Sequence, residues 1–243
     1  MNLINPLKTI LFFTVSTWIA PLLFIPISII QNLFGINTKY WSVNYSFFVN
    51  RILGVNVKYV NDTKRIETGF IIANHRSFCD FFLDPLISNG SIVSRHMATI
   101  AVLPGAILAM LDGRYISISR KQSRNEIFER ILDYMKRNPR SVIFFPEGTR
   151  RKHAQLQSIE QTKEFIKPGL LKSIYEYKKY PVQLQLTNNK EYILDEKNLL
   201  INFDVTATVF LSKPIYPEDY NSFDDFFDEI CKQWFENWIV PTF

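Results

Sequence analysis

The sequence is poor in the features that mark cross-linked, metal-bound or repetitive proteins. Its two cysteines, Cys79 and Cys231, form neither a disulfide framework nor the spacing of a metal site. Cysteine usage therefore demands no oxidising compartment. No internal repeat or low-complexity linker interrupts the chain. Its 243 residues suit one domain of ordinary size, or a domain with an appendage.

Signatures of several function classes are also missing. The chain has no Gly-x-Ser-x-Gly string, the nucleophile elbow of many α/β hydrolases, which argues against a serine hydrolase. It has no zinc-finger spacing, RNP string or helix-turn-helix cue, so we expect no nucleic-acid partner. It does have 47% hydrophobic residues, which argues against disorder, and 21 phenylalanines, which suit a protein that contacts lipid.

Positive charge is concentrated in one part of the chain. The net charge is +5, yet residues 112–152 alone hold eleven Lys or Arg against five acids, a net charge of +6. Such local basicity indicates an anionic partner, either a phosphate group or an anionic lipid surface. For Arg130, Lys136 and Arg137 the alternative is a solvated helix face.

Charge is absent from a long N-terminal run, residues 9–30. Its 22 residues are enough to span a bilayer as one helix, which takes about 20. Pro21 and Pro26 tend to break a helix, so two shorter helices in one leaflet fit equally well. A cleaved signal peptide is disfavoured because the run is long and no Ala-x-Ala site follows; a buried helix of a soluble protein is the remaining alternative. We predict a membrane anchor over residues 1–36 and one domain over 37–243.

Alternating apolar strands and amphipathic helices predict an α/β fold for that domain. Residues 91–99 fit either a strand or a helix. Strands are expected at 55–60, 69–73, 115–119, 141–145, 182–187 and 203–211, and helices at 40–53, 78–86 (with Ser77 as cap), 103–111, 124–137 and from 222 onward.

The first chemical motif is the string from Asn74 to Asp80, which follows a buried strand. His75 should lie at the carboxyl end of that strand, where α/β sheets bind ligands, and histidine suits general-base catalysis. Asp80 can orient its ring if a loop precedes the helix, because five residues on an ideal helix are about 140° apart. The alternatives are a structural histidine with a helix-capping aspartate, or a covalent mechanism using Ser77 or Cys79.

The second motif is the string from Phe144 to Arg150, a tight turn after an apolar strand. Gly148 lets the backbone approach a ligand, and Arg150 can grip a phosphate with two hydrogen bonds. Glu147 can orient that arginine or bond a substrate hydroxyl. Glu147 and Arg150 pairing on the surface is the alternative. Arg120 after another strand and Lys167 in a Lys-Pro-Gly turn are further candidate phosphate ligands.

These strings resemble the blocks of the membrane-bound glycerolipid acyltransferases that acylate lysophosphatidic acid. Asn74-His75 and Asp80 match the Asn-His-x4-Asp block, and Phe145 to Arg150 match Phe-Pro-Glu-Gly-Thr-Arg without change. Gly113 to Arg120 is similar to a block in which a glycine precedes an apolar strand ending in arginine. The resemblance runs from about residue 70 to residue 182.

The resemblance implies one acyltransferase domain with a mixed sheet flanked by helices, on a hydrophobic membrane helix or helix pair. It implies acyl transfer from acyl-CoA to the hydroxyl of lysophosphatidic acid, with no cofactor and no metal. His75 would take the hydroxyl proton and Asp80 would orient His75. The glycerol phosphate would be held by Arg120, Glu147, Gly148, Thr149, Arg150 and Lys167.

Partners implied by the resemblance are the lysophospholipid, acyl-CoA and membrane lipid, with no obligate protein partner, and an active site facing the cytoplasm. Ser119 stands where the family often has Asp, and Gln183 and Gln185 are unusual in the fourth block. These departures leave substrate identity more open than reaction type. The alternatives are another acceptor, such as glycerol 3-phosphate or a different lysophospholipid, and a non-catalytic lipid-binding relative.

Overall fold

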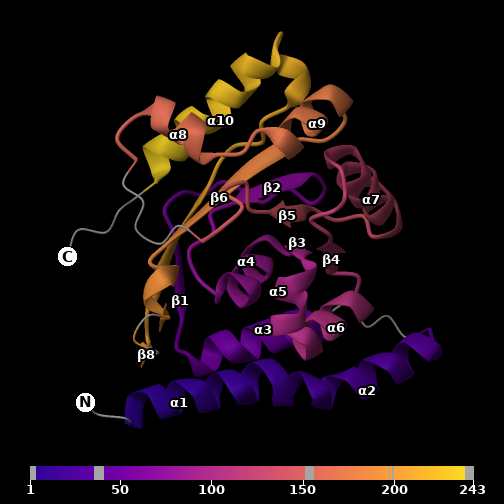
Figure 1. Ribbon diagram of the computed structural model, residues 1–243, viewed down its shortest axis with the longest axis vertical. Helices are drawn as coiled ribbons and strands as arrows, with labels where there is room; N and C mark the ends of the chain where they lie inside the picture. Colours follow the sequence, from indigo (N-terminus) through magenta and orange to yellow (C-terminus); the bar gives the residue numbers. More distant parts are fainter. Residues whose placement is uncertain (1–3, 36–40, 151–155, 197, 199, 239–243) are drawn as a thin grey trace.

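The structure, a computed structural model, describes residues 4–35, 41–150, 156–196, 198 and 200–238. Its centre is a seven-stranded mixed sheet of order β1-β9-β6-β2-β5-β3-β4 (Figure 1). The five strands from β6 to β4 run parallel, whereas β9 is antiparallel to β6 and β1 is parallel to β9. The strands are β1 (Asn56–Tyr59), β2 (Phe70–Ala73), β3 (Ser91–Arg95), β4 (Tyr115–Ile118), β5 (Val142–Phe144), β6 (Val182–Asn188) and β9 (Thr206–Leu211).

Helices cover both faces of the sheet, which confirms the predicted α/β fold. Along β2, Phe70 and Ile72 join the core on one face, while Ile71 and Ala73 join the core on the other. The first face carries α7 (Arg124–Arg137), α8 (Ile159–Phe165), α9 (Gly169–Tyr177) and α10 (Phe223–Asn237); the second carries α3 (Trp41–Ile52), α4 (Asp80–Ser88), α5 (His96–Ala101) and α6 (Leu103–Leu111). Because side chains alternate along a strand, a parallel sheet covered on both faces needs apolar residues at nearly every position.

Local sequence explains several helix boundaries. Ser123 and Glu126 form a capping box at the start of α7, whose bounds agree with the prediction. Residues 91–99 contain a strand to Arg95 and then α5. The proposed Ser77 cap is wrong, because α4 begins at Asp80 and the Ser77 hydroxyl accepts a bond from the Cys79 N–H instead. Helices α8 and α9 were not predicted.

The uncharged N-terminal run forms one continuous helix from Ile4 to Leu33 rather than two. It consists of α1 (Ile4–Phe13), a π-helical segment η1 (Thr14–Ile19) and α2 (Ala20–Leu33). The wider π turns lie just before Pro21, where a regular α-helix would lose a hydrogen bond and suffer a clash. The anchor–domain boundary predicted at residues 36 and 37 lies outside the described residues.

This N-terminal helix lies along the domain rather than projecting from it (Figure 1). Its second half packs against α6 and α3, and its first half contacts β8 (Leu200–Ile201), which pairs with β7 (Leu194–Asp195). The Trp41 indole N–H donates to Gln31. Thr9 accepts a bond from the Ile201 N–H at 3.2 Å. The helix is therefore held to the domain near both ends.

Candidate active site

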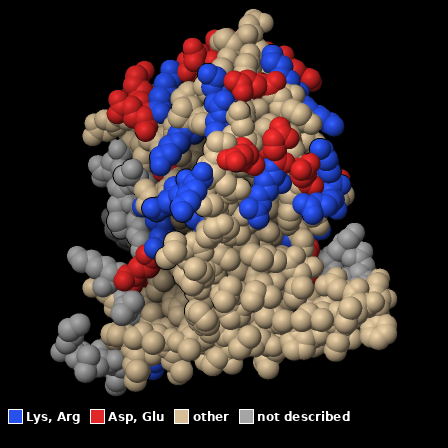
Figure 2. All heavy atoms as spheres, turned by 45° about the vertical axis from the view of Figure 1, so that its right-hand side comes forward, with Lys and Arg blue, Asp and Glu red and all other residues tan. Residues whose placement is uncertain are grey.

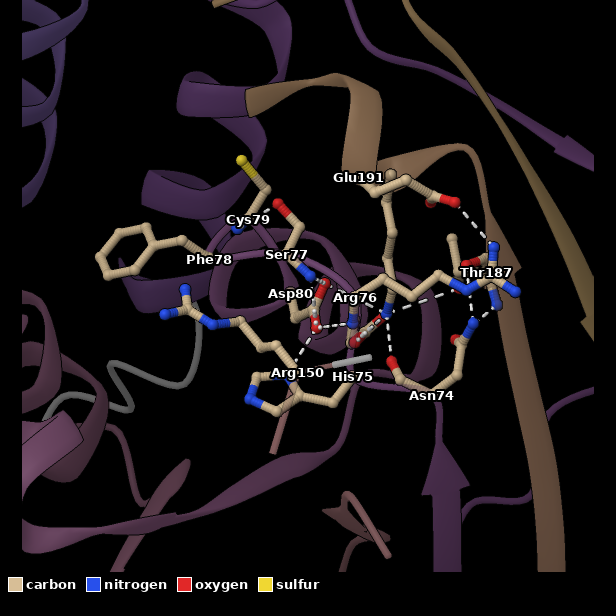
Figure 3. Close-up of polar contacts among 12 residues, drawn as sticks. Asn74, His75, Arg76, Ser77, Phe78, Cys79, Asp80, Arg150, Thr187 and Glu191 are labelled. Carbon is tan, nitrogen blue, oxygen red and sulfur yellow. Dashed lines mark hydrogen bonds and ion pairs between the residues drawn. The ribbon is translucent and has the colours of Figure 1, made fainter. Parts of the chain in front are cut away.

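His75 and Asp80 meet at the carboxyl end of β2. His75 lies in the loop that follows the strand, and Asp80 is the first residue of α4, so the predicted loop-then-helix arrangement is confirmed. The His75 Nδ1 is 2.7 Å from the Asp80 Oδ2 (Figure 3). The histidine side chain is 28% exposed, whereas the aspartate is buried. This geometry leaves the other ring nitrogen of His75 available to a substrate.

The Asp80 carboxylate is surrounded by donors. Its oxygens accept bonds from the backbone N–H groups of Arg76 at 2.9 Å and Ser77 at 3.1 Å, and the Lys190 ammonium lies 3.2 Å away. Burial raises the pKa of Asp80, but Lys190, His75 and the Ser77 N–H outweigh burial and hold that pKa below its usual value. Asp80 is therefore ionised at neutral pH and able to orient His75.

The turn after β5 supports His75 from another side. The Phe145 ring stacks on the imidazole, with ring centroids 4.5 Å apart. The Glu147 Oε2 accepts a bond from the His75 backbone N–H at 2.7 Å. The imidazole Nε2 bonds to no group within the described part of the chain. The ring is thus fixed at Nδ1 and on one face.

Two cavities open beside His75. The larger, of about 470 Å³, runs along the carboxyl ends of β3 and β5; its apolar wall includes Val93, Ile118 and Phe144, and Arg95, Arg124 and Lys167 also line it. A smaller cavity of about 260 Å³ lies between Phe78, Phe81 and Val102. Its walls share Arg150 and Phe78 with a third cavity beside the N-terminal helix. His75 thus lies between two cavities with apolar walls, the larger bordered by Arg95, Arg124 and Lys167 and the smaller by Arg150.

The structure distributes the predicted phosphate ligands unequally. Lys167 and Gly148 line the larger cavity with His75, and Arg150 lines the smaller one. Arg150 also forms an ion pair of 2.8 Å with Glu196. Thr149 is exposed on the same turn. Arg120 is exposed in the turn after β4 and, of the described residues, is not among those bordering either cavity.

Glu147 takes a place that the sequence did not indicate. It is 1% exposed and reaches back under the β2 loop, with its Oε2 on the His75 N–H. Burial raises the pKa of Glu147 well above its usual value, despite the opposing effects of the His75 N–H and Lys190. The carboxyl group supports the loop in this structure. Its predicted role in substrate binding stays a prediction, as do those of Arg120, Gly148, Thr149, Arg150 and Lys167.

Sequence reasoning missed two cations of the larger cavity and a buried lysine. Arg95 ends β3, inside the stretch left ambiguous, and Arg124 starts α7, where the basic run was noted only as a whole. Lys190 was not singled out, because its sequence neighbours Asn188, Asn189 and Glu191 are polar and give no local signal of burial. Arg151 and Lys152 of the basic stretch lie outside the described residues.

Burial argues against Cys79 as a nucleophile. The thiol is 1% exposed within an apolar cluster, and burial raises its pKa to about 12. The residues that the structure describes contain no group of three or more His, Cys, Asp or Glu side chains placed to hold a metal ion. The prediction that neither a metal nor a cofactor is needed stays untested.

The fold and site define an α/β protein with a His–Asp pair at the carboxyl edge of parallel strands. The chain belongs to the Acyltransferase family, whose sequence model matches residues 54–183. It is 28% identical over 108 residues to the 1-acyl-sn-glycerol-3-phosphate acyltransferase of Saccharomyces cerevisiae, a match that covers 43% of this chain and 36% of that protein.

A solved structure shares the whole fold. The crystal structure of the 1-acyl-sn-glycerophosphate (LPA) acyltransferase PlsC from Thermotoga maritima superposes with a TM-score of 0.68 and 15% sequence identity. The match covers 99% of this chain and 100% of that one. At this identity the likeness supports the fold, including the N-terminal helix, and leaves the substrate to be argued from the site.

Proposed function

We propose that this protein is a membrane-bound enzyme that transfers a fatty acyl group from acyl-CoA to the free hydroxyl of lysophosphatidic acid. The observation that carries the proposal is the 2.7 Å His75–Asp80 pair, placed between two cavities at the carboxyl edge of the sheet. Family membership, shown over residues 54–183, supports acyl transfer as the reaction type.

The geometry supports direct transfer with His75 as general base. The unprotonated Nε2 removes the proton of the acceptor hydroxyl while its oxygen attacks the thioester carbonyl. The tetrahedral intermediate then collapses, the carbon–sulfur bond breaks, and the His75 imidazolium returns the proton to the departing CoA thiolate. Asp80 holds Nδ1–H throughout and stabilises the positive charge on the ring. No acyl-enzyme is needed.

The larger cavity suits the phosphate end of the acceptor. Lys167, Arg95 and Arg124 border it, and Gly148 allows Lys167 to lie against the turn. Cations at the carboxyl edge of a sheet attract a phosphate group, which favours lysophosphatidic acid over a neutral glycerolipid. The smaller cavity, whose walls include Phe78, Phe81 and Val102 with Arg150 at its border, can receive an acyl chain next to His75.

The N-terminal helix supports membrane binding because the face that it turns away from the domain is apolar. The residues that it buries fully against the domain are small or polar: Thr9, Ser16, Thr17, Pro21 and Ser28. Between them, Phe12, Phe13, Phe24 and Ile25 are half-buried and pack against the core. Most of its exposed side chains are large and apolar, among them Leu7, Ile10, Leu11, Trp18, Ile19, Leu22, Leu23, Ile27, Ile30, Leu33 and Phe34. A helix of a soluble protein buries its apolar face in the core, so this arrangement indicates an apolar medium outside.

Neighbouring helices extend this apolar surface. Phe47 and Phe48 of α3 and Ile100, Leu103 and Ile107 of α5 and α6 are also exposed. Figure 2 shows charged side chains over the upper part of the molecule and a broad uncharged band below, along the N-terminal helix. We call this surface, formed by α1, η1, α2 and the exposed apolar residues of α3, α5 and α6, the apolar base.

The helix lying along the domain favours insertion into one leaflet. Pro6–Leu33 has the length and composition to cross a membrane. A crossing orientation would carry the flanking domain, held near both ends of the helix, into the hydrocarbon core. We therefore propose that the apolar base lies in one leaflet with His75 above it. The cytoplasmic orientation stays a prediction.

The direct experiment measures transfer of labelled oleate from oleoyl-CoA to lysophosphatidic acid by detergent-solubilised protein. The chain should form phosphatidic acid, and His75→Ala should abolish turnover while still binding vesicles. His96→Ala is the matched control: His96 bonds Ser117 and is not part of the proposed machinery. Full activity in His75→Ala would refute the mechanism.

A panel of acceptors tests the substrate. Glycerol 3-phosphate and lysophospholipids with other headgroups should react more slowly than lysophosphatidic acid. Equal rates on all acceptors would refute a specific lysophosphatidate enzyme. Vesicle binding without transfer to any acceptor would instead favour a non-catalytic lipid-binding protein.

A further inference from the structure

A fully buried lysine lies directly behind the His75–Asp80 pair. Lys190 belongs to the short turn after β6, which begins at Asn189 with φ of 70°, and its side chain is 0% exposed. The ammonium lies 3.2 Å from Asp80 Oδ1 and 2.9 Å from Asp84 Oδ2, and it donates to the Asn74 carbonyl at 2.6 Å. Its partners come from the loop after β2 and from α4.

Lys190 approaches Asp80 on the side away from His75. Asp80 Oδ2 is the oxygen nearest His75 Nδ1, whereas Lys190 lies nearest Oδ1. The carboxylate is therefore fixed at both oxygens, by the base on one side and by a cation on the other. This relationship links Lys190 to the reacting ring through a single carboxylate.

Asp84 places a second buried carboxylate beside the same ammonium. Asp80 and Asp84 are one helical turn apart on α4 and both are buried, so without a cation their charges would repel. Burial raises the pKa of Asp84 to about 6, an effect that Lys190 opposes. Gln185 donates to Asp84 at 3.1 Å and holds it in place.

We propose that Lys190 is a positioning residue for the proton transfer, because its ammonium fixes the Asp80 carboxylate that orients His75, with Asp84 as the counter-charge. This inference rests on the proposed function. The cation keeps Asp80 ionised, so Asp80 accepts from Nδ1–H and leaves Nε2 as the site that takes the hydroxyl proton.

Other charges surround this group. Arg76 and Glu191 form a buried ion pair at 2.8 Å, Glu147 lies under the β2 loop, and Arg150 pairs with Glu196 near the cavity mouth. Glu191 is adjacent to Lys190 in sequence, yet its side chain bonds the Arg76 guanidinium rather than Asp80. Glu191→Gln is therefore a matched control for weakening a buried ion pair in the same turn.

The test compares Lys190→Met/Asp84→Asn with Asp84→Asn alone. Both variants lack the Asp84 carboxylate, so the only difference between them is the Lys190 ammonium. Removing Asp84 as well as Lys190 also prevents two buried acids from being left without a cation. We expect kcat of the double variant to be about 10- to 100-fold below that of Asp84→Asn, with KM nearly unchanged. The acid limb of its pH–rate profile should move to higher pH by about 1 unit, because a cation near His75 has been lost.

Two further variants separate positioning from folding. Lys190→Arg, which keeps the charge, should recover part of the lost kcat. Glu191→Gln should lower the unfolding temperature but keep the pH profile of the wild type. If the double variant folds and shows the kcat and pH profile of Asp84→Asn, Lys190 only joins β6 to α4 and the proposal is wrong.

A readout independent of turnover distinguishes this failure from failure of the proposed function. The rate of His75 carbethoxylation by diethyl pyrocarbonate is followed against pH by peptide mass spectrometry. The midpoint should lie at higher pH in the double variant than in Asp84→Asn. If the wild type transfers no acyl group but this midpoint shifts, the proposed reaction fails and the action of Lys190 on His75 stands. An unchanged midpoint would overturn the inference even in an active enzyme.

Discussion

The ring of Phe145 lies nearly parallel to the imidazole of His75, with planes inclined by 27° and centroids 4.5 Å apart. The hydrogen bond to Asp80 fixes one edge of the imidazole, and Phe145 limits its tilt. A small rotation of the imidazole moves Nε2 away from an acceptor hydroxyl, and proton transfer is sensitive to that distance.

Phe145→Ala should therefore lower kcat by about 10- to 100-fold, since a displacement near 1 Å can cost that much. Phe145→Leu, which refills most of the volume, should lose less. Steady-state kinetics with both variants provide the measurement. Equal kcat for all three proteins would show that the ring does not position the base.

Gly148 is constrained by its own backbone and by Lys167. Its φ is +70°, and a Cβ there would lie 2.6 Å from the Lys167 Nζ. Gly148→Ala should lower the unfolding temperature by about 2–6 °C, because a residue with a Cβ is strained in this conformation. It should also raise KM for the acceptor several-fold by displacing Lys167.

A double-mutant cycle separates those two effects. In a Lys167→Ala background, Gly148→Ala should still lower the unfolding temperature but should no longer change KM. A KM effect that persists without the lysine would contradict a role of Gly148 acting through Lys167.

Glu147 should make stability depend on pH. Since burial raises its pKa in the folded state, the folded protein binds this proton more readily than the unfolded chain. Protonated Glu147 therefore contributes to the stability of the folded protein at low pH. This contribution is lost as the pH rises from the usual pKa of a glutamate through the raised pKa of the folded state.

Glu147→Gln removes this ionisation and keeps an oxygen to accept from the His75 N–H. The variant should unfold at least about 3 °C above the wild type at pH 8 and gain little at pH 4.5. Thermal unfolding in detergent at the two pH values is the check. The same shift at both pH values would mean that ionisation of Glu147 is not the cause.

Charges placed on the apolar base should weaken membrane binding. Leu22 and Leu23 are exposed on α2, and each leucine buried in lipid contributes about 1.5–3 kcal/mol. Leu22→Asp/Leu23→Asp should lower partitioning into phospholipid vesicles at least about tenfold, measured by co-sedimentation. Tyr216→Asp, at an exposed position next to the turn that packs on α9, is the control. If the leucine variant binds vesicles as well as the wild type does, the apolar base is not the surface that contacts the membrane.

The sequence predicted the parts of this fold whose signals are local. The apolar run before His75 is a buried strand, and the helical spacing of Ile131 and Met135 matches α7. Helix α8 has seven residues, too few for a clear period, and α8 and α9 are held by packing against α10 and α7.

Parts of the site depend on contacts between distant segments. The His75–Asp80 pair was foreseeable because only four residues of loop and turn separate its members. Lys190 reaches Asp80 across 110 residues of chain only because β6 lies next to β2 in the sheet. Arg95 joins Lys167 because β3 neighbours β5. Glu147 turns inward because the β5 turn folds beneath the β2 loop.

The π-helical segment sets the rotational phase of the N-terminal helix. Thr9 and Ser28 both face the domain, yet they are 19 residues apart, which on an ideal α-helix leaves them about 100° out of alignment. The wider turns of Thr14–Ile19 advance fewer degrees per residue and bring the two faces back toward one side. Deleting one residue from this segment would rotate α1 by about 100° against α2 and turn leucines toward β8. The length of this segment is therefore constrained more tightly than its composition.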